Sequence, residues 1–100
     1  MNDINVYKKW FFKIYTSNIN TINNNIMNIV IYSTNNCIYC TRAKDLLKSK
    51  SLECIEYLYE KNDPEYNTKK EHLSLLINKK NFTYPQIFIN DKYIGEYPYY

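Results

Sequence analysis

The feature that most constrains this chain is a pair of cysteines, Cys37 and Cys40, lying between an apolar run and a helical pattern. The run, residues 28–32, reads NIVIY, and its β-branched side chains are typical of a strand buried on both faces. After the pair, small and apolar residues recur at helical spacing, which predicts a helix from about Cys37 to Lys50. The two sulfurs are therefore expected at the carboxyl end of a strand, the edge where open α/β sheets hold their sites.

The rest of the chain predicts a small α/β domain. Thr68 with Glu71 forms a capping box, which predicts a second helix that runs to about Lys80. Runs of β-forming residues predict three more strands, at 52–59, 85–89 and 92–94, with a turn at 90–91. A strand, a crossover helix and a second strand make a right-handed parallel unit, and the final hairpin completes a four-stranded mixed sheet flanked by helices.

Residues 1–26 are expected to lie outside this domain, which spans 27–100. Bulky side chains recur at helical spacing near the amino terminus, at Tyr7, Trp10, Phe11 and Ile14. This stripe predicts an amphipathic helix over 6–15, and the Asn-rich segment that follows is expected to be a linker. No helix is expected after Gly95. Because Gly95 is the single glycine of the chain, we expect its backbone position to require glycine.

Composition excludes several classes of protein. The formal net charge is +3, but the basic residues are scattered and form no run, which argues against a nucleic acid or membrane partner. No stretch approaches the ~18 apolar residues of a membrane span. Three cysteines do not make a secreted disulfide framework and favour a reducing compartment. We therefore expect a cytoplasmic monomer.

The position of the two sulfurs favours redox chemistry. At a helix amino terminus, unpaired N–H groups and the macrodipole stabilise the Cys37 thiolate, the form that acts as a nucleophile. Cys40 lies one turn further on, where its thiol is able to attack a mixed disulfide formed on Cys37. Arg42 and Lys44 follow the pair and are expected to be solvated.

Zinc binding and inert cysteines are the rival interpretations of the pair. Zinc requires four ligands, and only Cys54 and His72 remain to complete a set. Neither has a paired spacing: Cys54 is expected to be a small core residue on its strand, and His72 a surface residue of the second helix. We therefore expect no metal site.

A second motif, Thr83-Tyr84-Pro85, opens the third strand. Proline cannot donate to the ladder of a sheet, so Pro85 is interpreted as a strand start or a cis turn. From the sequence alone, a trans peptide bond is the default.

With these motifs the chain resembles the glutaredoxin family of the thioredoxin fold. The segments that carry the resemblance are IVIYSTNNCIYCTRAKDLL (29–47), TYPQIFIN (83–90) and KYIGE (92–96). The resemblance implies a thiol-disulfide oxidoreductase that uses glutathione to reduce protein disulfides or glutathione mixed disulfides, with Cys37 as the nucleophile and Cys40 as the resolving thiol. It also implies a cis Tyr84-Pro85 bond opposite Cys37. The residues implied to bind glutathione are Tyr39, Thr83, Tyr84, Pro85, Gly95, Glu96 and Tyr97.

Three departures from the family bear on glutathione. Thr34 stands where many relatives carry a lysine that binds a glutathione carboxylate, so a charge-assisted contact of about 1.5–3 kcal/mol is absent. Glu96 replaces a second glycine and adds a negative charge, while Pro98 removes a backbone donor. The helix that normally ends the family is missing as well. We hypothesise that the helix over 6–15 covers the sheet face left open; a flexible extension or a dimer contact is the alternative.

Other functions stay open at this point. One is a thioredoxin-like disulfide reductase that is reduced by a protein instead of glutathione. Another is a carrier of a [2Fe–2S] cluster held by Cys37 and glutathione from two subunits, which the resemblance also allows. A third is a redox-regulated interaction module that uses the basic aromatic helix.

Overall fold

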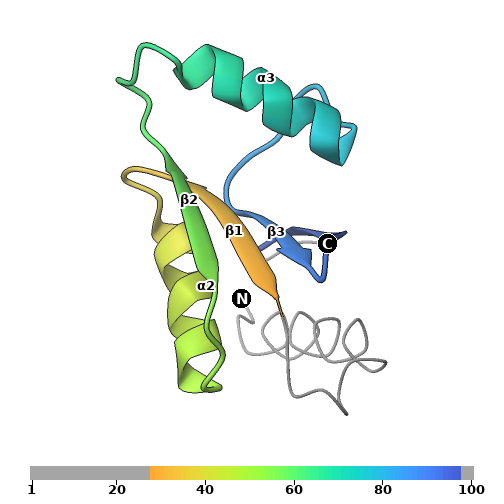
Figure 1. The fold of residues 1–100 in the computed structure, drawn as a ribbon. Coiled ribbons are helices and arrows are strands. Elements are labelled where there is room, and N and C mark those ends of the chain that lie inside the picture. The colour runs from red at the N-terminus through yellow and green to blue at the C-terminus, as the bar shows by residue number, and fades with distance from the viewer. Residues whose placement is uncertain (1–27, 98–100) are drawn as a thin grey trace, which may run out of the picture.

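A computed structural model describes residues 28–97 of the chain (Figure 1). The elements are β1 (Ile29–Thr34), α2 (Ile38–Ser49), β2 (Ile55–Tyr59), α3 (Tyr66–Ile77), β3 (Gln86–Ile89) and β4 (Lys92–Glu96). The expected helix over 6–15, the linker that follows it and Pro98 lie outside the described residues, so the division of the chain at 26/27 stays a prediction. Within the described part, no helix follows β4.

The strands form one four-stranded sheet in the order β2-β1-β3-β4. β1 pairs with β2 in parallel, and the β1–β3 and β3–β4 pairs are antiparallel, which confirms the predicted mixed sheet. β2 begins at Ile55, three residues later than predicted. The reason is that the Leu52 N–H bonds to the Leu47 carbonyl and so closes the end of α2. β1 extends two residues further than predicted, to Thr34, whose hydroxyl donates to the Tyr59 carbonyl at 2.7 Å.

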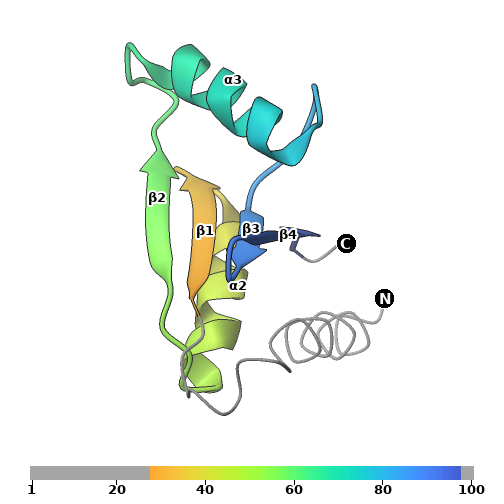
Figure 2. The ribbon, with the colours of Figure 1, turned by 45° about the vertical axis from the view of Figure 1, so that its right-hand side comes forward.

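Helix α2 covers one face of the sheet, and the core lies between them (Figure 2). Ile29 and Ile31 are fully buried on this face because side chains alternate along β1. The core cluster consists of Ile29, Ile31, Ala43, Leu47, Ile87, Ile89, Ile94 and Tyr97. On the other face of β1, Val30 and Tyr32 are half-buried and only Thr34 is buried, so the prediction of a strand buried on both faces holds in full for one face alone.

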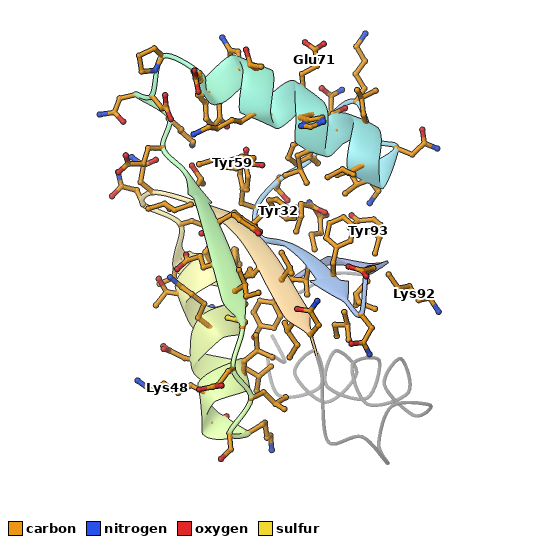
Figure 3. All side chains as sticks on the ribbon, viewed as in Figure 1. Tyr32, Lys48, Tyr59, Glu71, Lys92 and Tyr93 are labelled. Atoms are coloured by element: carbon orange, nitrogen blue, oxygen red, sulfur yellow. A yellow bond between two sulfur atoms is a disulfide. The ribbon has the colours of Figure 1, made fainter. Side chains whose placement is uncertain are left out.

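The opposite face of the sheet carries a row of aromatic rings. Tyr32 contacts Tyr57, Tyr59 and Phe88, with ring centroids 5.3–5.7 Å apart, and Phe88 contacts Tyr93 at 5.3 Å. In Figure 3, Tyr32, Tyr59 and Tyr93 lie below α3, which crosses the end of the sheet. The helix leaves part of this face uncovered, since Tyr57 is 48% exposed.

The predicted capping box of α3 is wrong. The helix begins at Tyr66 with Glu65 as its N-cap, and Thr68 lies inside the first turn. The turn before the helix sets this earlier start, because the Asp63 carboxylate accepts the Glu65 N–H at 2.8 Å and pairs with Lys69 at 2.9 Å. The helix also ends early, at Ile77, because Asn78 adopts a left-handed conformation (φ 58°).

The described residues include no helix that is long and apolar enough to span a membrane.

Candidate active site

Cys37 is the N-cap of α2. Its backbone is extended, and its sulfur accepts the Cys40 N–H at 3.2 Å. The chain turns sharply just before it, at Asn36 (φ 57°), a conformation that asparagine tolerates. The Cys40 N–H and the helix dipole therefore stabilise a thiolate at Cys37.

The structure joins Cys37 and Cys40 in a disulfide, with the Cα atoms 5.3 Å apart. The two sulfurs differ in access to solvent: Cys40 is 3% exposed, whereas Cys37 is only half-buried. An external disulfide therefore meets Cys37 first. Cys40 lies next to Cys37, where its sulfur is able to reach whatever is bound to Cys37.

The proline loop, residues 83–85, faces Cys37. The Tyr84-Pro85 peptide bond is cis, as the resemblance implied and contrary to the trans default. The Tyr84 carbonyl oxygen lies 3.7 Å from the Cys37 sulfur. The loop thus presents backbone groups directly beside the Cys37 sulfur, where an extended peptide could pair with them.

A cavity of about 570 Å³ separates the proline loop from the start of α2, and we call it the proline-loop cavity. Cys37, Tyr39, Thr83 and Tyr84 line it, so four of the expected site residues come together there. Burial raises the pKa of the Tyr84 phenol, and a hydrogen bond with the Tyr66 hydroxyl at 3.2 Å raises it further. The Tyr84 phenol that lines the cavity is therefore uncharged at physiological pH.

Two lysines that sequence reasoning missed also line the proline-loop cavity. They are Lys61, from the β2–α3 turn, and Lys70, from α3. Lys70 lies 5.9 Å above the Phe82 ring, which holds the ammonium near the cavity. Thr34 lines the same cavity, so these two lysines bring positive charge to the cavity that Thr34 borders.

Glu96 does not stand free at the site. Its carboxylate accepts hydrogen bonds from the Thr83 hydroxyl at 2.7 Å and the Gln86 side-chain amide at 3.1 Å. Gln86 is fully buried, and its amide also donates to the Thr83 carbonyl at 2.5 Å. The Tyr93 hydroxyl donates to the side-chain oxygen of Gln86. The charge expected to disturb glutathione binding therefore braces the proline loop.

The structure places the other expected residues of this region in the core. Gly95 is buried with φ 130°, a conformation that favours glycine, which confirms that this position requires it. Tyr97 belongs to the core cluster, so its ring does not line the proline-loop cavity. Pro85, the last residue of the loop, is fully buried.

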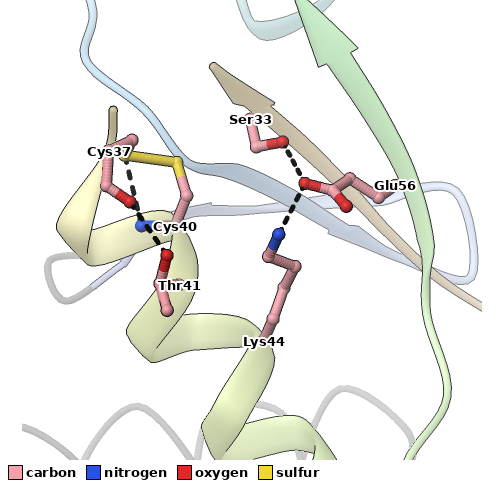
Figure 4. Close-up of polar contacts among 6 residues, drawn as sticks. All are labelled: Ser33, Cys37, Cys40, Thr41, Lys44 and Glu56. Atoms are coloured by element: carbon pink, nitrogen blue, oxygen red, sulfur yellow. Dashed lines mark hydrogen bonds and ion pairs between the residues drawn. A yellow bond between two sulfur atoms is a disulfide. The ribbon is translucent and has the colours of Figure 1, made fainter. Parts of the chain in front are cut away.

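A second cavity, of about 510 Å³, lies on the other side of Cys37, and we call it the β2-side cavity. Both cysteines line it, together with Lys44 and Glu56. The Glu56 carboxylate accepts the Ser33 hydroxyl at 2.5 Å and pairs with the Lys44 ammonium at 2.9 Å (Figure 4). The Lys44 side chain keeps 37% of its surface exposed, so it is solvated as expected while it also pairs with Glu56. Arg42, in contrast, lies over the Tyr39 ring, 5.6 Å from its centroid.

The residues considered for zinc are not assembled. Cys54 packs partly buried against the core, and His72 is exposed on α3. Between residues 28 and 97, His, Cys, Asp and Glu side chains form no group of three or more that could hold a metal ion.

One signal for the Ser33–Glu56–Lys44 contacts was present in the sequence. Cys54 was expected to face the core, and alternation along the strand puts Glu56 on that same face, toward α2. Lys44 follows Cys40 by four residues and so shares its side of the helix. The contacts of Glu96 had no such signal, because they depend on the register between β3 and β4, where a bulge interrupts the pairing.

Comparisons with known proteins agree with this geometry. The family model described as Glutaredoxin matches residues 29–94. Glutaredoxin 1 of Escherichia coli (strain K12) is 38% identical over 72 residues, which cover 71% of this chain and 85% of the relative. The crystal structure of glutaredoxin 1 from Francisella tularensis, complexed with cacodylate, superposes with a TM-score of 0.56 at 30% identity, covering 70% of this chain and 83% of that one. The dithiolic glutaredoxin of Trypanosoma brucei brucei gives a TM-score of 0.58 at 28% identity, with 69% and 68% covered.

Proposed function

The chain belongs to the glutaredoxin family, and from this premise we propose that it is a thiol-disulfide oxidoreductase that uses glutathione to reduce protein disulfides and glutathione mixed disulfides. The observation that carries the proposal is the position of Cys37, at the N-cap of α2 and opposite the cis-proline loop. A thiolate at this position is stabilised by the helix and is open to an incoming disulfide.

The reaction follows from the two sulfurs. The Cys37 thiolate attacks a disulfide R–S–S–G, a new S–S bond forms, and the leaving sulfur departs with the electron pair. The mixed disulfide on Cys37 is then opened in one of two ways. A second glutathione thiolate regenerates the Cys37 thiolate, or Cys40 attacks Cys37 and closes the internal disulfide. Because the dithiol must be returned to its reduced state, we place the protein in a reducing compartment such as the cytoplasm.

Glutathione use is supported by the charges around the proline-loop cavity. Glutathione carries carboxylates at both ends, and Lys61 and Lys70 line the cavity next to Cys37. These lysines offset the absence of a lysine at Thr34. Glu96 is held by Thr83 and Gln86, so its charge is partly neutralised by hydrogen bonds and is less repulsive to an anionic ligand than a free carboxylate.

The proposal is tested by glutathione saturation kinetics of the wild type, Lys61→Ala, Lys70→Ala and the control Lys92→Ala. Lys92 is exposed on β4 and does not line the proline-loop cavity. A partly solvated charge-assisted contact of about 1 kcal/mol predicts a roughly fivefold higher KM for glutathione in each cavity variant, with kcat preserved. Kinetics that do not saturate with glutathione even in the wild type would favour a protein reductant instead.

A further inference from the structure

The proposed function leaves Ser33, Lys44 and Glu56 without a role, although they converge behind the redox pair from β1, α2 and β2 (Figure 4). Among the residues that line the β2-side cavity, Glu56 is the only carboxylate and Lys44 the only cation. Cys40 lines this cavity but not the proline-loop cavity, whereas Cys37 lines both. Cys40 therefore borders the β2-side cavity together with the Glu56–Lys44 ion pair.

Cys40 has a chemical requirement that Cys37 lacks. Buried thiols hold their protons more tightly, because burial disfavours the thiolate. Cys40 must nevertheless lose a proton in order to attack a mixed disulfide on Cys37. With 3% exposure, it has little direct access to bulk solvent for this transfer.

We propose that Glu56 and Lys44 form a proton relay that serves Cys40 in the resolving step. This inference rests on the proposed roles of Cys37 and Cys40. A cavity of about 510 Å³ with polar walls has room for water that bridges the Cys40 thiol and the Glu56 carboxylate. Lys44 follows Cys40 by four residues on the same side of α2 and lines the same cavity, so it brings positive charge to the space beside the sulfur on which negative charge develops.

The Cys40 S–H passes its proton through cavity water to Glu56 while the sulfur attacks Cys37–S–S–R. The Cys37–Cys40 bond forms, the bond between the Cys37 sulfur and S–R breaks, and R–S⁻ leaves with the electron pair. Neutralised Glu56 no longer holds Lys44 as an ion pair, so the ammonium stabilises the Cys40 thiolate during the attack. The proton on Glu56 then returns to solvent.

The surroundings of Glu56 keep its carboxylate ionised. Burial alone would raise the pKa of the Glu56 carboxyl, but hydrogen bonds from Ser33 and Lys44 outweigh this and hold the pKa below its ordinary value. The carboxylate is therefore ionised at neutral pH. The other ionisable neighbours, Lys48, Glu53 and Cys54, line an adjoining cavity with Glu56 that includes neither sulfur of the pair.

The test separates the two chemical steps with a chromogenic probe, bis(nitrocarboxyphenyl) disulfide. The whole chain has three cysteines, so a Cys54→Ala background leaves only the redox pair. Attack by reduced Cys37 releases one coloured thiolate, and resolution by Cys40 releases the second. Stopped-flow traces therefore give both rate constants without any need for glutathione.

We expect Glu56→Gln to slow the second release by about tenfold or more at neutral pH, because a positioned base is lost. In Glu56→Gln, the rate constant of the second release should rise about tenfold per pH unit, because hydroxide must replace the carboxylate. In the parent, the same rate constant should change little between about pH 5.5 and 7.5. Lys44→Met should also slow the second release. The first release, which reports an intact Cys37 site, should match the parent in both variants, and the control Glu53→Gln should match the parent in both phases.

A second release that keeps the parent's rate and pH dependence in Glu56→Gln overturns the relay. Repeating the experiment with glutathione disulfide as the oxidant separates this inference from the proposed function. If the aromatic probe reacts in two phases but glutathione disulfide does not react, glutathione use is refuted while the relay is still decided by the aromatic probe.

Discussion

Removal of the Glu96 carboxylate is expected to loosen the proline loop that faces Cys37. Glu96→Ala deletes the acceptor for the Thr83 hydroxyl and for the buried Gln86 amide. The contact with Thr83 is exposed and is worth about 0.5–1 kcal/mol, while weakening the hydrogen bonding of a fully buried amide costs about 1–2 kcal/mol. The free energy of unfolding should therefore fall by about 2 kcal/mol, which corresponds to a melting temperature lower by roughly 8–16 °C for a domain of this size.

The assay is urea unfolding followed by circular dichroism, with Glu71→Ala as the matched control. Glu71 is exposed on the outer side of α3 (Figure 3), and its loss should change the free energy of unfolding by less than about 0.5 kcal/mol. Glu96→Gln keeps one acceptor oxygen and should fall between the wild type and Glu96→Ala. If Glu96→Ala is as stable as the control, the carboxylate does not brace the loop, and its charge is free to repel an anionic ligand.

Three further outcomes follow from the structure. Gly95→Ala should lower the free energy of unfolding by about 1–3 kcal/mol, because φ 130° is unfavourable for alanine; unchanged thermal unfolding would refute the need for glycine. The pKa of Glu56 lies below its ordinary value of 4.5, so its ionised form stabilises the fold above that pH, and this stabilisation is lost as the pH falls through the folded pKa. The stability advantage of the wild type over Glu56→Gln should accordingly shrink in acid denaturation profiles below about pH 4.5, and a constant difference would contradict the assigned contacts. Deletion of residues 1–26 should lower the melting temperature by more than about 5 °C if the predicted helix over 6–15 covers the aromatic face near Tyr57; an unchanged melting temperature would remove that hypothesis.

The order and type of the elements were predictable because local signals agreed with the fold. The β-branched run before Cys37 and the helical spacing after it place the redox pair correctly, and alternation along β1 accounts for the buried Ile29 and Ile31. The boundaries of α3 were predicted less well. The side chain of Asp63 competes with the predicted cap at Thr68, and both patterns are acceptable when the sequence is considered alone.

The site was predictable where it depends on chain order and unpredictable where it depends on register. Cys37 is the N-cap of α2 and Cys40 lies in its first turn, so their proximity follows from their spacing. The cis bond at Pro85 came from the resemblance, since the sequence alone favours trans. The partners of Glu96 and Glu56 lie on other strands, in the proline loop or on α2, and their contacts arise only when the sheet is assembled.

The central claim is that Cys37 is the glutathione-dependent nucleophile and Cys40 the resolving thiol. The most direct measurement is glutathione-dependent reduction of a small mixed disulfide by the wild type, Cys37→Ser and Cys40→Ser. We predict that the wild type turns over, that Cys37→Ser is inactive, and that Cys40→Ser retains activity because glutathione itself opens the mixed disulfide. An inactive wild type whose Cys37 still reacts readily with an aromatic disulfide would contradict the account, because the nucleophile would be intact and the glutathione site absent.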